Sequence, residues 1–267
     1  MIRMVAIDID GTLLNSQRQV TENVRAALRR AQDAGLVICL ASGRLIPTLL
    51  PVAEQAGVTG PVVTCNGAYA ELEDGETAFS ALLSPSVQEV LLDYAEAKGI
   101  TANVYQPRRV LCNRESSYLE MYRQRTGGYP VVMDADDLKN EPATKMIFIQ
   151  EPGANELDAA RFAPDDAAGK FHLTVSEPIY LEFLPPGVNK GVGVQAVAAR
   201  LGLDASEVAA IGDYYNDIEM IEWAGLGAAM ASGAPEVREA ANMVVPGHDD
   251  DGVATFLGHI LANRSFI

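Results

Sequence analysis

The chain has 267 residues, of which 48% are hydrophobic and 21% charged, and its formal net charge is −16. So acidic a chain is unlike nucleic-acid binders, which usually carry a basic face, and no apolar run approaches the roughly 20 residues that span a bilayer. Its three cysteines show no zinc-ligand spacing. We therefore expect a reduced, cytoplasmic protein with no nucleic-acid or membrane partner.

Short continuous apolar runs recur in the first and last thirds of the chain. They end at Asp8, near Ser42, near Asn66 and at Asp213. These runs do not alternate apolar and polar residues, which is typical of strands buried on both faces of a parallel sheet. A segment of helical apolar periodicity, with Thr21 as its candidate N-cap, separates the first two runs. The alternation of strand and helix predicts a doubly wound, Rossmann-like α/β fold.

The middle of the chain follows a different pattern. It is preceded by a candidate β-hairpin around Asp74-Gly75 and opens with an amphipathic helix whose candidate capping box is Ser86 and Glu89. Several later strand candidates alternate, as half-exposed antiparallel strands do. We therefore predict an inserted α+β cap domain and a two-segment α/β core, with the cap at 84–183 and the core at 1–83 and 184–267.

Polar residues stand where the predicted core strands end. In doubly wound sheets, ligands bind just beyond the carboxyl ends of the strands. Asp8 and Asp10 are two positions apart, so both side chains can face one pocket. An Asp-Gly turn is the simpler explanation of this pair alone. Considered without the other residues, Ser42 and Asp217 are most simply explained as helix caps, and Lys190 as a solvated surface residue.

Four motifs occur together in one order: DIDGT at 8–12, ASGR at 41–44, NKG at 189–191 and GDYYNDIEM at 212–220. Their order and spacing resemble the haloacid dehalogenase superfamily, and within it the Cof-type sugar-phosphatase group. The insert between the second and third motifs lies where that group carries its large, C2-type cap. The resemblance implies a Mg²⁺-dependent phosphohydrolase that cleaves phosphate monoesters of small metabolites, with sugar phosphates as the leading substrates.

The resemblance also implies the roles of individual residues. Asp8 would be the nucleophile that forms an aspartyl-phosphate, and Asp10 the general acid and base. Lys190 would place a positive charge beside both the nucleophile and the phosphate. The Mg²⁺ ligands would be the Asp8 and Asp213 carboxylates and the Asp10 carbonyl, with Asn216 and Asp217 acting through water or by orientation.

A second group of residues is expected around the phosphate. Arg44 leaves two alternatives open, contact with the substrate or pairing with a nearby acid. Tyr214 departs from the small polar residue usual at its position in the group. The candidate phosphate and substrate residues are Gly11, Thr12, Ser42, Gly43, Arg44, Asn66 and Asn216.

Two other functions remain open at this point. One is a phosphosugar mutase or a dedicated sucrose- or mannosyl-type phosphatase on the same scaffold. The other is a non-catalytic regulator that binds a phosphorylated metabolite. The intact acids and lysine of the four motifs favour an enzyme, with a small phosphorylated metabolite as its partner and a monomeric or homodimeric state.

Overall fold

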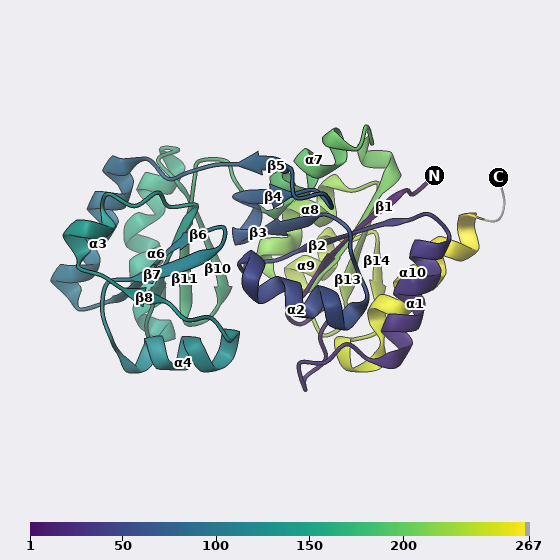
Figure 1. Ribbon diagram of the computed structural model, residues 1–267, viewed down its shortest axis with the longest axis horizontal. Coiled ribbons are helices and arrows are strands. Elements are labelled where there is room, and N and C mark those ends of the chain that lie inside the picture. Colours follow the sequence, from purple (N-terminus) through teal and green to yellow (C-terminus); the bar gives the residue numbers. More distant parts are fainter. Residues whose placement is uncertain (265–267) are drawn as a thin grey trace.

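The computed structural model describes residues 1–264, whose strands form two separate sheets (Figure 1). The larger sheet draws strands from both ends of the chain, in the order β14-β13-β12-β1-β2-β3-β4-β5. The first six run parallel, and β4 and β5 form an antiparallel edge. In chain order the strands are β1 (Met4–Asp8), β2 (Val37–Ala41), β3 (Val62–Thr64), β4 (Tyr69–Glu71), β5 (Thr77–Ser80), β12 (Val208–Gly212), β13 (Leu226–Met230) and β14 (Met243–Val245).

Helices cover both faces of this sheet, as strand β1 illustrates. All of its residues are buried, with Val5 and Ile7 in one apolar cluster and Met4 and Ala6 in another. The first cluster is closed by α1, α2 and α10, and the second by α7, α8 and α9. The predicted doubly wound core is therefore confirmed. The helix bounds are α1 (Glu22–Asp33), α2 (Ile46–Ala56), α7 (Lys190–Arg200), α8 (Ile218–Trp223), α9 (Pro235–Ala240) and α10 (Gly252–Arg264).

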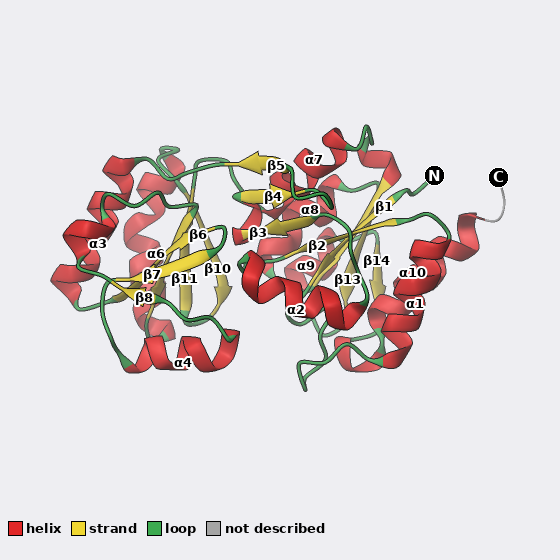
Figure 2. Ribbon diagram, viewed as in Figure 1, coloured by secondary structure: helices red, strands yellow, loops and turns green. Residues whose placement is uncertain are grey.

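The smaller sheet comes from the middle of the chain and has the order β10-β11-β9-β6-β7-β8 (Figure 2). Its pairings are antiparallel except for β7 with β8. The elements are α3 (Pro85–Lys98), β6 (Thr101–Gln106), β7 (Arg109–Cys112), α4 (Ser117–Thr126), β8 (Val131–Val132), α5 (Ala135–Leu138), β9 (Lys145–Ile149), α6 (Pro152–Ala167), β10 (His172–Glu177) and β11 (Tyr180–Leu184). The predicted α+β insert is confirmed as part of the fold.

The two faces of the smaller sheet differ in what they contact. One face packs Phe148 and Phe183 against Leu91 of α3 and Phe162 of α6. Residues of the opposite face share a buried cluster with Leu45 and other residues of the larger-sheet part. The second face therefore turns toward the core. The bounds 84–183 of the cap stay a prediction, supported by the division of the strands between the sheets.

Three local predictions can be compared with the structure. Thr21 is the N-cap of α1 and accepts a hydrogen bond from the Val24 amide. The predicted hairpin forms between β4 and β5. The Ser86/Glu89 capping box is wrong, because Ser84 caps α3 and Pro85 takes the first helical position. Proline is favoured there since that position needs no N–H donor.

None of the described helices combines the length and the apolar character that crossing a bilayer demands.

Candidate active site

The carboxyl ends of the core strands open into a cavity of about 390 Å³ between the larger sheet and the cap. Asp8 is the last residue of β1, Ser42 follows β2, and Asp213 follows β12. All of the predicted site residues line this cavity except Thr12 and Asn66. Residues more than 200 positions apart in the chain thus meet at one edge of the sheet, as the strand-end pattern predicts.

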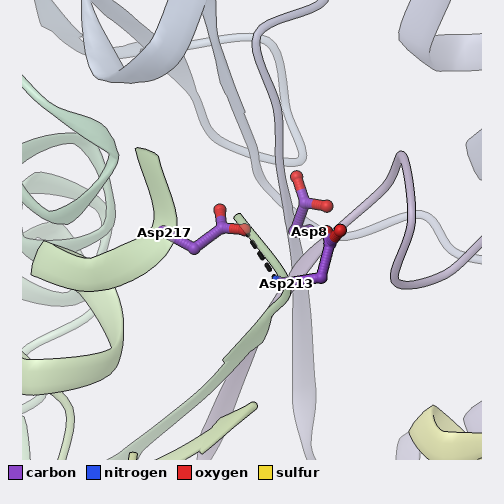
Figure 3. A group of neighbouring side chains, drawn as sticks. All are labelled: Asp8, Asp213 and Asp217. Carbon is purple, nitrogen blue, oxygen red and sulfur yellow. Dashed lines mark hydrogen bonds between the residues drawn. The ribbon is translucent and has the colours of Figure 1, made fainter. Parts of the chain in front are cut away.

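Three carboxylates lie together at the base of the cavity (Figure 3). One oxygen each of Asp8, Asp213 and Asp217 lies within 4.8 Å of the others. Lys190 Nζ donates to Asp8 Oδ1 and to Asp217 Oδ1, both at 2.5 Å. Asp8, Asp217 and Lys190 are all buried. One ammonium group thus faces three acids, which leaves an excess of negative charge at the base.

Lys190 is placed by the beginning of α7. Asn189 caps this helix, and its side chain accepts a hydrogen bond from the Val192 amide at 3.0 Å. Lys190 is the first helical residue, so its side chain starts at the level of the strand ends. A Cβ at Gly193 would lie 2.5 Å from Val63, which shows how closely α7 packs on the sheet. The NKG motif therefore supplies the cap of the helix, and Gly193, two residues after the motif, permits its close approach.

Asp217 organises the loop after β12. Its Oδ2 accepts hydrogen bonds from the amides of Asp213, at 3.0 Å, and Tyr214, at 3.1 Å (Figure 3). Because its Oδ1 accepts from Lys190, both oxygens of this buried carboxylate are engaged. The side chain of Tyr214 lines the cavity and packs edge-on against Tyr215. The bulky residue therefore does not break the hydrogen bonds that shape the loop.

Burial, and after it the neighbouring acids, raise carboxyl pKa values at this site. Burial raises the pKa of Asp8 well above its usual range, and the charge of Asp217 raises it further, against the opposing effect of Lys190. Burial and then Asp217 raise the pKa of Asp213 to about 7. The pKa of Lys190 is also raised, because the two acids outweigh the opposing effect of its burial. A bound cation would relieve this repulsion, and hard oxygen donors are the ligands that Mg²⁺ prefers.

Gly11 fits this site through both its backbone and its missing side chain. Its φ is +86°, a conformation that favours glycine. A Cβ at this position would lie 2.4 Å from Asp213 Oδ2. Thr12 does not reach the cavity and instead donates a hydrogen bond from its hydroxyl to Asp213 Oδ1 at 3.1 Å. Both residues of the first motif therefore shape the position of Asp213.

Asp10 lies outside the three-carboxylate group. Arg44 Nε and Nη2 donate to its two oxygens at 2.7 and 2.6 Å, and Arg18 lies 3.7 Å away. Burial raises the pKa of Asp10, but the Arg44 hydrogen bonds and charge outweigh it, so the net shift is downward. Arg44 was expected either to contact the substrate or to pair with a nearby acid, and in the structure it pairs with Asp10. Asp10 and Arg44 both still line the cavity.

Asn66 connects the base of the cavity to the cap. It lies in the 3₁₀ turn η1 (Cys65–Gly67), whose three residues all have positive φ. Asn216 Nδ2 donates to Asn66 Oδ1 at 3.0 Å, and Asn66 Nδ2 donates to Glu182 Oε2 at 2.8 Å. A Cβ at Gly67 would lie 1.9 Å from the Asn189 carbonyl oxygen, so η1 and the start of α7 are in direct contact.

Sequence reasoning missed the cap side of the cavity. Lys145 Nζ and Glu182 Oε2 form an ion pair at 2.6 Å, with both side chains 1% exposed. The signal was present, because each is a charged residue in an otherwise apolar strand, KMIFI and YLEFL. The cavity residues that were not predicted are Leu14, Asn15, Ser16, Arg18, Thr48, Tyr105, Tyr122, Arg125, Thr126, Lys145, Ile147, Ser176, Glu177, Pro178, Tyr180, Glu182 and His248.

The fold and the site define a class of protein: an α/β core with an inserted α+β region, which brings buried carboxylates and one lysine together at the strand ends. The sequence family described as haloacid dehalogenase-like hydrolase matches residues 5–257. The chain belongs to this family. The predicted resemblance is therefore confirmed, and so is the expectation of an enzyme.

Individual relatives match along nearly the whole chain. YxeH of Bacillus subtilis is 32% identical over 271 residues, covering 95% of this chain and 96% of that protein. An HMP-PP phosphatase of Cronobacter sakazakii is 30% identical over 264 residues, covering 98% and 96%. The crystal structure of a haloacid dehalogenase-like hydrolase from Bacteroides thetaiotaomicron has a TM-score of 0.85 at 26% identity, covering 97% of this chain and all of that one.

Proposed function

We propose that the chain is a Mg²⁺-dependent phosphatase that hydrolyses phosphate monoesters of small metabolites through an aspartyl-phosphate on Asp8. The observation that carries this proposal is the position of Asp8, buried at the end of β1 and hydrogen-bonded to Lys190 within the three-carboxylate group. Family membership and the phosphatase relative support the same activity. The cap at 84–183 would cover the reacting groups and limit the size of the substrate.

The proposed reaction has two steps. In the first, a carboxylate oxygen of Asp8 attacks phosphorus, the bond to the leaving oxygen breaks, and Asp10 protonates that oxygen. In the second, Asp10 removes a proton from water, which attacks the phosphorus and releases phosphate from Asp8. Since both steps use the same carboxyl group of Asp10, its proton is returned within one turnover.

The residues around Asp8 fit a Mg²⁺ ion. Asp8 and Asp213 would hold it together with the Asp10 carbonyl, while the engaged oxygens of Asp217 suit it to orienting the loop instead. When bound, Mg²⁺ would neutralise negative charge on the nucleophile and the phosphate. Lys190 adds a fixed positive charge beside Asp8.

Ser42 and Arg44 would hold the phosphate. The Ser42 oxygen accepts a hydrogen bond from the Arg44 amide at 3.2 Å, which leaves its hydroxyl hydrogen to donate to a phosphate oxygen. Gly11 and Gly43 line the same wall without side chains. A phosphate bound here would compete with Asp10 for the Arg44 guanidinium. That competition would free Asp10 and raise its pKa toward the value a general acid needs.

The substrate class follows from the size of the cavity and from the relatives. A cavity of about 390 Å³ suits a small metabolite rather than a polymer. A sugar phosphate is the leading proposal, and the similarity to a phosphatase of Cronobacter sakazakii supports a small phosphorylated metabolite as the substrate class. Cytoplasmic location and a monomeric or homodimeric state stay predictions from the sequence.

Phosphate release from a panel of phosphorylated metabolites, with Mg²⁺ or with EDTA, tests the proposal. We expect release that requires Mg²⁺ and that falls by at least about 10³-fold in Asp8→Asn. The variant should remain folded, since it removes a buried charge of raised pKa. Retained turnover in this variant would rule out the covalent route. Phosphate returned to a hexose phosphate would instead support the mutase, and no release from any substrate would support the regulator.

A further inference from the structure

The cap side of the cavity carries balanced charges. Lys145 pairs with Glu182 at 2.6 Å, and Arg125 Nη2 pairs with Glu177 Oε2 at 2.6 Å. All four of these residues line the cavity. Each cation on this wall thus already has its own carboxylate. A second anionic group on a substrate would find no unpaired positive charge there.

The same wall carries aromatic side chains and one hydroxyl without a partner. Tyr105, Tyr122 and Tyr180 all line the cavity. The Tyr105 hydroxyl donates to that of Tyr122 at 2.8 Å. The Tyr180 hydroxyl is buried and has no hydrogen-bond partner among the described residues, and the whole residue is only 6% exposed. A buried polar group without a partner is costly, so a ligand that supplies one is favoured.

The groups of this wall that remain available for hydrogen bonding are mainly donors. Glu182 already accepts from Lys145, Asn66 and Ser176. Lys145 has three N–H donors, of which one serves Glu182, and its ammonium lies 4.5 Å from the centre of the Tyr105 ring. Lys145 and Tyr180 therefore offer hydrogens to oxygen or nitrogen acceptors of a bound molecule.

We propose that Tyr180, Lys145 and the Arg125–Glu177 pair form the leaving-group subsite, which selects uncharged groups rich in hydrogen-bond acceptors. A polyol, a sugar or a polar ring fits this description. A leaving group with a second phosphate or a carboxylate does not, because it would have to displace a paired carboxylate or stay desolvated without a counterion. This proposal rests on the proposed function and adds the class of leaving group.

The experiment compares three classes of substrate in the full-length enzyme with Mg²⁺. Acetyl phosphate reports the reacting centre alone, because its leaving group is too small to reach the cap wall. Neutral sugar, polyol and nucleoside monophosphates measure how well the subsite accepts an uncharged leaving group. Hexose bisphosphates and phosphoglycerate measure how strongly it rejects an anionic one. We expect kcat/KM to be at least about tenfold higher for the best neutral monophosphate than for any anionic substrate.

Two variants and one control sharpen this comparison. Tyr180→Phe should lower kcat/KM for the best neutral monophosphate about tenfold and leave acetyl phosphate unchanged. Glu177→Gln frees Arg125 and should raise the ratio of bisphosphate to monophosphate hydrolysis about tenfold. Glu115→Gln is the matched control, because it breaks the exposed Glu115–Arg123 pair, which does not line the cavity. It should change neither kcat/KM for the best neutral monophosphate nor the ratio of bisphosphate to monophosphate hydrolysis.

The outcomes separate the two proposals. If the wild-type enzyme hydrolyses none of the three classes, the proposed function itself is wrong. If it hydrolyses acetyl phosphate but prefers anionic leaving groups, the subsite proposal is overturned while the function stands. The subsite proposal is also overturned if Tyr180→Phe lowers hydrolysis of acetyl phosphate and of the neutral substrate equally, or changes neither.

Discussion

The core and the cap each bury a lysine against carboxylates, but the two sites are balanced differently. Lys190 at the strand ends faces Asp8 and Asp217, with Asp213 close by. Within the described part of the chain, Lys145 in the cap pairs with Glu182 alone. Both side chains are 1% exposed, so burial does not distinguish them.

The difference lies in the remaining charge. Around Lys190 the acids outnumber the base, and burial together with the charge of Asp217 raises the pKa values of Asp8 and Asp213. Around Lys145 the charges cancel. A surplus of buried acid favours binding of a cation, whereas a matched buried pair contributes structure and hydrogen bonds. The two lysines should therefore respond differently to the same substitution.

Removing the core lysine should have the largest effect, and mainly on the rate. Lys190→Met is expected to lower kcat for phosphate release by about 10³-fold, because the charge beside the reacting phosphate is lost. Steady-state kinetics at saturating Mg²⁺ measure this. Lys170→Met, at an exposed lysine of the cap, is the control. If kcat of Lys190→Met stays within tenfold of wild type, Lys190 does not act on the reaction.

Removing the cap lysine should lower stability, in addition to weakening binding of the leaving group. Lys145→Met leaves Glu182 buried without its cation and should lower the free energy of unfolding by about 3 kcal/mol. Replacing both partners, as in Lys145→Met with Glu182→Leu, should recover most of that loss. Urea denaturation of the single and double variants measures both quantities. If the double variant is no more stable than the single one, the pair is not the source of the loss.

The metal-free protein should lose stability as the pH rises. A carboxyl whose pKa is raised by folding stabilises the fold below its unfolded value of about 3.9. For Asp213 this contribution is lost as the pH rises through about 7. With EDTA, the melting temperature should therefore fall between pH 5 and pH 7.5.

Added Mg²⁺ should reverse that loss. At pH 7.5 an excess of Mg²⁺ should raise the melting temperature by about 5 °C, corresponding to about 2 kcal/mol of binding. At pH 5 the rise should be smaller, because protons compete with the metal for the carboxylates. Asp213→Asn should flatten the pH dependence and remove the Mg²⁺ response. An unchanged Mg²⁺ response in this variant would exclude Asp213 as a ligand.

Loosening the contact between the two regions should have the smallest effect. Asn66→Gly keeps a residue that accepts the left-handed backbone but removes the hydrogen bonds to Glu182 and Asn216. We expect kcat/KM to fall by about fivefold, or about 1 kcal/mol, and the Mg²⁺ concentration for half-maximal activity to rise. Unchanged Mg²⁺ dependence would show that Asn216 keeps its position without Asn66.

The core could be predicted from the sequence because its signals are local. Each buried parallel strand is one continuous apolar run, and the polar residue after it lies at the edge where the strand ends. For this reason the sequence could predict that the acids and Lys190 lie in one cavity, without knowledge of how distant segments pair.

The cap side could not be predicted in the same way. Lys145 and Glu182 lie on neighbouring antiparallel strands, and only the register and the facing of those strands bring them together. Whether Arg44 meets the substrate or Asp10 depends on a side-chain conformation that no motif encodes. The Ser86 cap failed for a local reason, since Pro85 at the first helical position favours Ser84 as the cap.

The turn η1 has a consequence for the interpretation of variants. Cys65, Asn66 and Gly67 take consecutive left-handed conformations, which most residues adopt only at a cost of about 1 kcal/mol or more. A mutational scan scored on activity should therefore find reduced tolerance at this tripeptide, but less reduced than at the reacting acids. Because neither Cys65 nor Gly67 lines the cavity, that intolerance would reflect backbone geometry, and a scan scored on protein abundance would separate it from chemistry.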